Sequence, residues 1–298
     1  MAPRESLARR SAIELLDELE IREPPVDPEL IAHRKELLFE EKDGFPPGAY
    51  GALFRTGNQF GIIVSSGCPG DGHRRFTIAH ELGHYHIPDH AERLFPGGDN
   101  IVPSFGGHFR GRKDPLEVEA DCFASELLMP DRFVRPLIHQ VGDGLPAVRA
   151  LADTFRTSMS AAAIRYASLT GEPVAVLVSY RGVIEWTARS SALSAHGWAR
   201  QPLKREWSPR GSATHRLASA PDRIERGESD DDCMLLCEWF DEAPATEVVE
   251  EALGLGAFGR VLTILAVRDL PDPDEEPDPD DDGSSGDWRD AMRDYRLG

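Results

Sequence analysis

The sequence predicts an α+β protein, and three features of its hydrophobic pattern support this prediction. Apolar residues recur at helical spacing through most of the chain up to residue 170. Two strand-like runs in this part flank a "TGNQ" turn. Beyond Gly171 the pattern changes to alternating strands. We therefore expect a small sheet with helices, a following helical segment, and a C-terminal strand-rich α+β domain.

The first 130 residues contain the signals for the small sheet and its helices. The first helical pattern is formed by Leu7, Ile13, Leu15, Leu16 and Leu19. In a second helix, Asp27 is the expected N-cap and Pro28 the first helical residue. There follow two strands in "YGALFRTGNQFGIIVSSG", a helix in "RRFTIAHELGHYHI", a glycine-rich loop from about Pro88 to Pro115, and the strongly periodic helix "PLEVEADCFASELLMP".

The remainder of the chain is expected to begin with helices and to continue with strands. Helices are predicted at 131–140 and at 145–169, the second interrupted by the polar turn "RTSMS". Strands are predicted in "GEPVAVLVSYRGVIEWTA", "CMLLCEWF" and "GRVLTILAVRDL", with a helix "ATEVVEEALGLG" between the last two. These patterns divide the chain into residues 1–130, 131–170, 171–270 and 271–298. The last segment is expected to be a disordered acidic tail, because it lacks apolar residues to bury.

Charge and composition narrow the classes of function. The 298-residue chain has a net charge of −19, and the run "DLPDPDEEPDPDDDG" contains no Lys or Arg. Such a surface repels phosphate, so we expect no direct nucleic-acid binding. No segment is apolar enough to span a bilayer, and the N-terminus lacks the apolar region of a secretion signal. We therefore expect a cytoplasmic protein without membrane contact, whose four cysteines are free thiols.

The stretch "HELGH" places His80, Glu81 and His84 in the spacing H-E-x-x-H. Residues four apart share one face of a helix, so the two imidazoles can bind one Zn²⁺. Glu81 points roughly 100° around the helix, toward the open side of the metal. There it can accept a proton from water that the zinc polarises. The spacing predicts His80 and His84 as metal ligands and Glu81 as the catalytic residue.

A catalytic zinc needs a third protein ligand, and Glu117 is the favoured candidate. It lies at the edge of the apolar stripe of the helix "PLEVEADCFASELLMP", where a carboxylate can meet a metal. Asp121 follows one turn later on the same side. Its carboxylate is placed to accept a hydrogen bond from a ligand imidazole, so we expect Asp121 to support the site from behind the ligands.

Three other residues are weaker candidates for the third ligand. His86 lies on the far side of the predicted helix from the first two ligands, and His90 follows Pro88, where the helix should have ended. Glu119 lies on the other side of the apolar stripe. If Glu119 is not a ligand, we expect it to lie with Glu126 on a solvated face.

Two further residues near the motifs are candidates for contacts with substrate or with an oxyanion. Tyr85 directly follows the second histidine, and Arg165 lies in the helix after "SMSAAA". Packing for Tyr85 and a structural salt bridge for Arg165 are the favoured alternatives. The pair of helices predicted at 145–169 resembles a helix-turn-helix. Its mixed charge favours packing or protein recognition over DNA binding.

The motifs "RRFTIAHELGHY" and "EVEADCFASELLMP", supported by "VDPELIA" and "LADTFRTSMSAAAIRYASL", resemble those of the ImmA/IrrE family of zinc metallo-endopeptidases. The resemblance implies a zincin-like zinc metallopeptidase domain within residues 1–130. It implies the same ligands, His80, His84 and Glu117, and the same catalytic Glu81 as the helix positions. Residues 131–170 would be a helix-turn-helix-like segment packed on that domain, and residues 171–270 a sensor-like domain.

The resemblance also implies a role and partners. Members typically cut a partner repressor, so we expect a protein substrate, a helix-turn-helix repressor, whose cleavage derepresses phage, mobile-element or stress-response genes. The alternative is a non-proteolytic regulatory binding protein with a structural metal site, closed by a fourth ligand such as His90 or His108. A weaker alternative is a nucleic-acid-binding regulator. The expected cofactor is Zn²⁺, and Mn²⁺ would suit the same donors.

Overall fold

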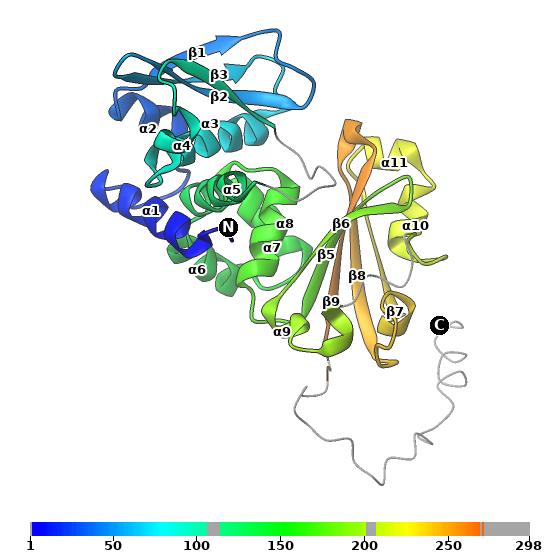
Figure 1. The fold of residues 1–298 in the computed structure, drawn as a ribbon. Coiled ribbons are helices and arrows are strands. Elements are labelled where there is room, and N and C mark those ends of the chain that lie inside the picture. The colour runs from blue at the N-terminus through cyan, green and yellow to red at the C-terminus, as the bar shows by residue number, and fades with distance from the viewer. Residues whose placement is uncertain (1, 106–113, 201–206, 269, 271–298) are drawn as a thin grey trace, which may run out of the picture.

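Figure 1 shows the computed structural model, which describes residues 2–105, 114–200, 207–268 and 270. This part of the chain contains eleven α-helices and two β-sheets, which confirms the predicted α+β class. The two sheets lie at opposite ends of the fold, with helices between them (Figure 1). His108 and the acidic tail lie outside the described residues, so the expectations for them stay predictions.

The first sheet has four strands in the order β1-β3-β2-β4. These are β1 (Leu38–Lys42), β2 (Ala49–Thr56), β3 (Gln59–Ser65) and β4 (Asn100–Phe105). β1 is parallel to β3, whereas the β2–β3 and β2–β4 pairs are antiparallel. The predicted turn joins β2 to β3, with Thr56 opposite Gln59. β4 lies at one edge of this sheet.

The loop predicted from Pro88 to Pro115 is wrong in its described part, because it contains a helix and a strand. The helix α4 (His90–Leu94) begins after Asp89, whose φ is 71°. The strand is β4, held by its register with β2, in which Leu53 lies opposite Val102. Both elements are too short to show a strong period, and strand formation depends on the partner strand more than on local propensity.

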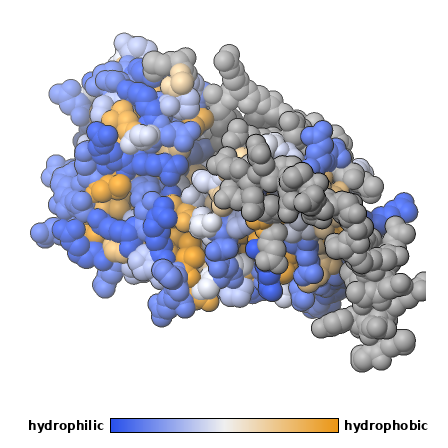
Figure 2. Space-filling model, turned by 90° about the horizontal axis from the view of Figure 1, so that it is seen from below, coloured by the Kyte–Doolittle hydropathy of each residue, from blue (hydrophilic) through white to orange (hydrophobic). Residues whose placement is uncertain are grey.

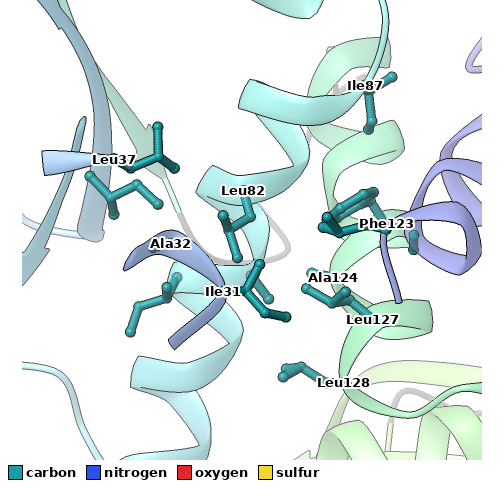
Figure 3. Packing of buried hydrophobic residues seen from close by; sticks show 14 of the residues in the cluster. Ile31, Ala32, Leu37, Leu82, Ile87, Phe123, Ala124, Leu127 and Leu128 are labelled. Atoms are coloured by element: carbon teal, nitrogen blue, oxygen red, sulfur yellow. The ribbon is translucent and has the colours of Figure 1, made fainter. Parts of the chain in front are cut away.

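The helices of the first half pack against one face of this sheet and against one another. They are α1 (Glu5–Glu18), α2 (Pro28–Arg34), α3 (Asp71–His86) and α5 (Pro115–Leu128). Figure 3 shows the core between them, where Leu82 of α3 faces Phe123 and Ala124 of α5, with Ile31 of α2 alongside. The predicted cap of α2 is confirmed, because the Asp27 side chain accepts hydrogen bonds from two backbone N–H groups of its first turn.

The second sheet has five antiparallel strands in the order β6-β5-β9-β8-β7. These are β5 (Val174–Tyr180), β6 (Val183–Arg189), β7 (Ser229–Leu235), β8 (Glu247–Gly254) and β9 (Arg260–Val267). One face packs on α6 (Asp131–Val141), α7 (Leu145–Phe155) and α8 (Met159–Leu169). The short helices α9 (Ser191–Ser194), α10 (Ala213–Ala218) and α11 (Pro221–Glu225) cover the other face. Three 3-10 turns complete this half: η1 (Gly197–Arg200), η2 (Leu236–Glu238) and η3 (Gly256–Phe258).

The helix predicted in "ATEVVEEALGLG" is wrong, because this segment forms β8. Its two central glutamates point to opposite faces of the sheet. Glu250 accepts hydrogen bonds from the Ala213 and Thr214 backbone N–H groups of α10, and Glu251 accepts one from Leu145 at the start of α7. Glutamate favours helices by itself, but here each carboxylate satisfies the first N–H groups of another helix. The predicted strand "CMLLCEWF" likewise ends at Leu235, where η2 begins.

The surface seen in Figure 2 is mostly hydrophilic, and its hydrophobic residues lie in small separate groups. Scattered exposed apolar groups of this kind are ordinary on globular proteins. In the described ranges, no helix is both long and apolar enough to cross a lipid bilayer.

The start of α3 contacts the turn between α7 and α8. At Gly72, a Cβ atom would lie 2.6 Å from the Ser158 backbone nitrogen and 2.8 Å from the Thr157 carbonyl carbon. The adjacent Asp71 forms an ion pair with Arg156 at 2.8 Å. The helix that carries the H-E-x-x-H motif is therefore held at its first turn by the helical segment, at a spacing that only glycine permits.

A buried arginine joins the same helical segment to α5. Arg165 of α8 donates hydrogen bonds to the Met129 carbonyl oxygen at 2.9 Å and to the carboxylates of Glu126 and Asp131. Glu126 also accepts a hydrogen bond from the Asp131 backbone N–H. Glu126 is 2 % exposed and Arg165 2 % exposed. The expected solvated position of Glu126 is therefore wrong, because the partner that satisfies its charge lies 39 positions away in sequence.

Substitution Gly72→Ala is expected to lower the free energy of unfolding by about 1–3 kcal/mol, because the added methyl group would press on rigid backbone. Urea unfolding measures this change. Gly97→Ala is the control, since a Cβ atom there meets nothing within 4 Å, and it should change stability by less than about 0.5 kcal/mol. Equal effects of the two substitutions would contradict the close contact.

Substitution Arg165→Ala is expected to lower the free energy of unfolding by about 3–5 kcal/mol, because it leaves the buried Glu126 carboxylate without its cation. The exposed Arg149 on α7 offers the control Arg149→Ala, which should change stability by less than about 0.5 kcal/mol. In the double variant Arg165→Met with Glu126→Gln, most of the loss should be recovered. A double variant as unstable as Arg165→Ala alone would refute this reading.

Candidate metal centre

The structure brings together three side chains from α3 and α5. His80 and His84 lie on successive turns of α3, with their Nε2 atoms 3.0 Å apart. Glu117, in the first turn of α5, has one carboxylate oxygen 3.3 Å from His80 Nε2 and the other 3.2 Å from His84 Nε2. The two histidines are buried, whereas the Glu117 side chain is 32 % exposed. The cluster is therefore open to solvent on the side of Glu117.

The donor atoms of His80, His84 and Glu117 fit a single metal ion. They all lie within 4.8 Å of one another. Donors bound tetrahedrally to Zn²⁺ at about 2.0–2.1 Å lie roughly 3.3–3.4 Å apart, close to the three distances found here. Two imidazoles and one carboxylate are a ligand set of catalytic zinc sites, in which the fourth position stays open.

The close contact of α3 with α5 depends on Gly83. A Cβ atom at this position would lie 3.1 Å from Phe123 Cδ1 and 3.3 Å from Ala120 Cα. A side chain here would push the two helices apart by a few tenths of an ångström or more. Gly83 therefore sets the distance at which Glu117 meets the two histidines.

Glu81 lies beside this cluster in a closed environment. Its side chain is fully buried, and neither carboxylate oxygen has a hydrogen-bond partner among the described residues. Gly51 of β2 makes room for it, because a Cβ atom there would lie 2.8 Å from Glu81 Oε1. Burial raises the pKa of Glu81 to about 7; the negative charge of Glu117 acts in the same direction, and His80 opposes the rise.

The two histidines have opposite electrostatic environments. Burial disfavours a charge on His80, but hydrogen bonds to Asp121 and Glu117 overcome it and raise the pKa of His80 to about 10. Burial lowers the pKa of His84 to about 4. Burial would raise the pKa of Glu117, yet its hydrogen bonds with both histidines hold that pKa well below its usual range. The carboxylate of Glu117 is thus ionised, as a metal ligand must be.

Asp121 lies behind His80, on the side away from the cluster. Its Oδ1 atom is 3.0 Å from His80 Nδ1, while His80 Nε2 faces Glu117. A carboxylate in this position fixes both the orientation of the ring and the nitrogen that carries the proton. The structure therefore places the Asp121 carboxylate beside the His80 ring, and its supporting role in a metal site stays a prediction.

The second histidine has a longer set of contacts, which the sequence did not predict. His84 Nδ1 lies 3.2 Å from His90 Nδ1, and His90 Nε2 lies 3.1 Å from Glu119 Oε2. His90 and Glu119 are both 0 % exposed, so the expected solvated position of Glu119 is wrong. Neither residue belongs to the group of donors that could share a metal with His84.

Glu119 is buried because Arg4 satisfies its charge. The Arg4 backbone N–H donates to Glu119 Oε1 at 2.9 Å, and the Arg4 guanidinium group lies 3.1 Å from Oε2. Burial would raise the pKa of Glu119, but these hydrogen bonds and that from His90 lower it. Arg4 precedes Glu119 by 115 positions, and the sequence contains no local signal for this pairing.

The remaining candidates lie in packing or structural contacts. The Tyr85 ring packs edge-on against Phe60, with centroids 5.5 Å apart, and His86 packs against Phe123 at 5.9 Å. Arg165 takes part in the buried ion pair with Glu126 described above. Contacts of Tyr85 or Arg165 with a substrate or an oxyanion stay predictions.

Substitution Glu117→Gln is expected to weaken Zn²⁺ binding by more than about 100-fold, because it removes a charged metal ligand. Loss of a residue that only hydrogen-bonds to a ligand typically weakens binding by about 10- to 100-fold. Competition with a chromophoric chelator measures the affinity. The exposed Glu92 on α4 provides the control Glu92→Gln, which should bind Zn²⁺ like the wild type. Unchanged affinity in Glu117→Gln would remove this residue from the ligand set.

Comparison with solved structures shows a shared fold. A chain described as a "Mycobacterium tuberculosis transcriptional regulator" superposes with a TM-score of 0.56 at 15 % sequence identity. The superposition covers 88 % of this chain and 76 % of that chain. No curated protein sequence matches this chain.

Comparison with protein families identifies the part of the chain that contains the metal centre. Residues 46–166 match the Peptidase M78 family, described as an IrrE N-terminal-like domain. The match begins before β2 and ends in α8, so it includes all of α3 and α5. It confirms the resemblance inferred from the two motifs. Residues 46–166 are therefore identified as an IrrE N-terminal-like domain of the Peptidase M78 type.

Proposed function

We propose that this protein is a zinc-dependent endopeptidase that cleaves a helix-turn-helix repressor and thereby activates phage, mobile-element or stress-response genes. The match of residues 46–166 to a metallopeptidase family supports the enzymatic part of the proposal. The solved structure with a shared fold is described as a transcriptional regulator, and this supports a regulatory role. In this proposal the metal ligands are His80, His84 and Glu117, and Glu81 is the catalytic base.

The proposal rests above all on the complete burial of the Glu81 carboxylate and on its raised pKa. A fully buried carboxylate that makes no well-formed hydrogen bond is costly to maintain, so a purely structural metal site would gain nothing from one. Its pKa of about 7 is matched to a group that accepts and returns a proton near neutral pH. His80, His84 and Glu117 would hold the ion, and the Glu117 side chain, which is 32 % exposed, leaves this cluster open to solvent.

The protein residues would divide the work of peptide hydrolysis. When bound, the metal supplies Lewis acidity that polarises the attacking water and the scissile carbonyl group. Glu81 accepts the proton of that water and passes it to the leaving amine. Glu117 contributes negative charge to the ligand set, and Asp121 orients the His80 ring. The complete burial of Glu81 keeps bulk water away from its carboxylate and so maintains its raised pKa.

The first sheet offers a place for an extended polypeptide. β4 is an edge strand, and among the described residues its free edge has unpaired backbone groups. Such an edge can bind an extended peptide as an additional strand. Ser104 of β4 lies close enough to interact with the Glu81 carboxylate, so a peptide on this edge would run past the metal centre. This arrangement favours a protein substrate over a small molecule.

The division of the chain into functional parts is also a proposal. The metallopeptidase domain would extend to residue 130, and the helical segment 131–170 would pack on it. Residues 171–270 would form a sensor-like domain. The shared core of α6–α8 with β5 and β9 would couple the last two parts mechanically, so a signal received in the second sheet could reach the start of α3.

Substitution Glu81→Gln is expected to abolish cleavage while Zn²⁺ stays bound, because the amide cannot accept a proton. The zinc-loaded wild type and Glu81→Gln are incubated with the proteome of the source organism, and new N-termini are labelled and sequenced. We expect few new N-termini, all dependent on Glu81, in a helix-turn-helix protein. His84→Ala, which loses the metal, serves as a second inactive control.

Two outcomes of this experiment would contradict the proposal. If the wild type produces no N-termini beyond those of Glu81→Gln, the protein is not an endopeptidase under these conditions of metal loading. If Glu81→Gln also retains one partner as firmly as the wild type and keeps its effect on transcription, the non-proteolytic alternative is correct.

A further inference from the structure

We infer that His90 and Glu119 form a positioning relay for the metal ligand His84, and that Arg4 fixes its far end. The relay is defined as Arg4, Glu119, His90 and His84. The inference rests on the proposed metal site and goes beyond it, because it assigns a role to two buried residues outside the ligand set. It concerns metal affinity and ligand orientation, and none of its residues other than His84 contacts the ion.

The relay is a continuous series of hydrogen-bond contacts through the buried interior. His84 Nδ1 lies 3.2 Å from His90 Nδ1, and His90 Nε2 lies 3.1 Å from Glu119 Oε2. The Glu119 carboxylate then meets the backbone N–H and the guanidinium group of Arg4. His84, His90 and Glu119 are at most 1 % exposed, so solvent does not compete for these contacts.

Metal binding would determine the proton positions along the relay. His84 Nε2 faces the other two donors, so it is the nitrogen that binds the metal. A neutral imidazole ligand then carries its proton on Nδ1 and donates it to His90 Nδ1. His90 must in turn be protonated on Nε2 and donates to Glu119. Each donor meets one acceptor, and the series ends at a carboxylate that a cation neutralises.

The two metal-binding histidines are therefore supported in different ways. His80 contacts the carboxylate of Asp121 directly, at 3.0 Å. Glu119 is two residues before Asp121 and two after Glu117, so it projects from the opposite side of α5. From there it reaches His84 only through His90 of α4. α5 thus supplies the metal ligand Glu117. It also supplies the carboxylate behind each histidine, Asp121 for His80 and Glu119 for His84.

The geometry argues against His90 as a fourth ligand. His90 approaches Nδ1 of His84, whereas the ion would lie at Nε2, on the opposite edge of the same ring. His90 Nε2 is engaged with Glu119 and faces away from the cluster. His90 therefore lies behind His84, which leaves the fourth position of the metal open.

Arg4 connects the relay to the N-terminal helix. Its guanidinium group also contacts the Asp89 carboxylate at 3.1 Å and the Pro88 carbonyl oxygen at 3.2 Å, both just before α4. Arg4 thus joins the start of α1 to the residues that precede His90 and to Glu119 on α5. The fixed position of Arg4 near the N-terminus therefore helps to orient the metal ligand His84, 80 positions later in the chain.

The test uses the full chain, stripped of metal with a chelator, and measures Zn²⁺ affinity by competition with a chromophoric chelator. His90→Ala should weaken Zn²⁺ binding about 10- to 100-fold, the effect typical of a lost outer partner. Arg4→Ala and the isosteric Glu119→Gln should weaken it less, since each preserves part of the relay. His86→Ala is the matched control: His86 is a partly buried histidine at the end of α3, outside the relay, and its loss should leave the affinity unchanged.

Two measurements separate positioning from general packing. His90→Gln supplies one acceptor and one donor in place of the imidazole, and recovery of affinity relative to His90→Ala supports a hydrogen-bonding role. Long-range ¹H–¹⁵N correlation spectra of the zinc-loaded wild type should show His84 protonated on Nδ1 and His90 on Nε2. His90 protonated on Nδ1 would overturn the relay, as would wild-type affinity in both His90→Ala and Glu119→Gln.

The outcomes also distinguish this inference from the proposed site. If Glu117→Gln and His84→Ala bind Zn²⁺ as tightly as the wild type, the metal site itself is misplaced. If these two lose the metal while the relay variants retain it, only the relay is refuted. Neither result depends on a peptidase assay, so both can be read before any substrate is known.

Discussion

The structure depends on the close packing of α3 against α5. Gly83 allows the two helices to approach at Phe123 and Ala120, and this contact brings Glu117 to the two histidines of the H-E-x-x-H motif. The donors of a metal site must be held within a few tenths of an ångström, so the helices that carry them need a rigid contact. The buried core around Leu82 and Phe123 supplies that rigidity.

α5 illustrates how a helix can carry four carboxylates without a solvated face for all of them. Glu117 faces both metal-site histidines, Asp121 contacts the far side of the His80 ring, Glu119 meets Arg4 and His90, and Glu126 meets Arg165. Buried carboxylates are tolerated only where cations or donors satisfy them. Their partners lie just before α1 (Arg4), in α3 (His80 and His84), in α4 (His90) and in α8 (Arg165), so these carboxylates also hold distant parts of the chain together.

The helical segment links the metal centre to the second sheet. α7 and α8 share a core with β5 and β9, and the turn between them touches the first turn of α3 at Gly72. Glu251 of β8 strengthens this assembly by accepting the Leu145 N–H at the start of α7. A displacement of α7 and α8 relative to the sheet would therefore shift the first turn of α3, the helix that carries the candidate metal ligands His80 and His84.

The sequence by itself determined the features that depend on local spacing. The H-E-x-x-H interval put His80 and His84 on one helix face, the period of the later helix selected Glu117 and Asp121, and the Asp27-Pro28 pair marked the start of α2. The tertiary structure decided which of the remaining charged residues are buried, because their partners lie far away in sequence. Glu119 pairs with Arg4, 115 positions away, and the glutamates of β8 cap helices more than 35 positions distant. Helical propensity and periodicity describe only one segment at a time, so they could not reveal that β8 is a strand or that His90 lies against His84.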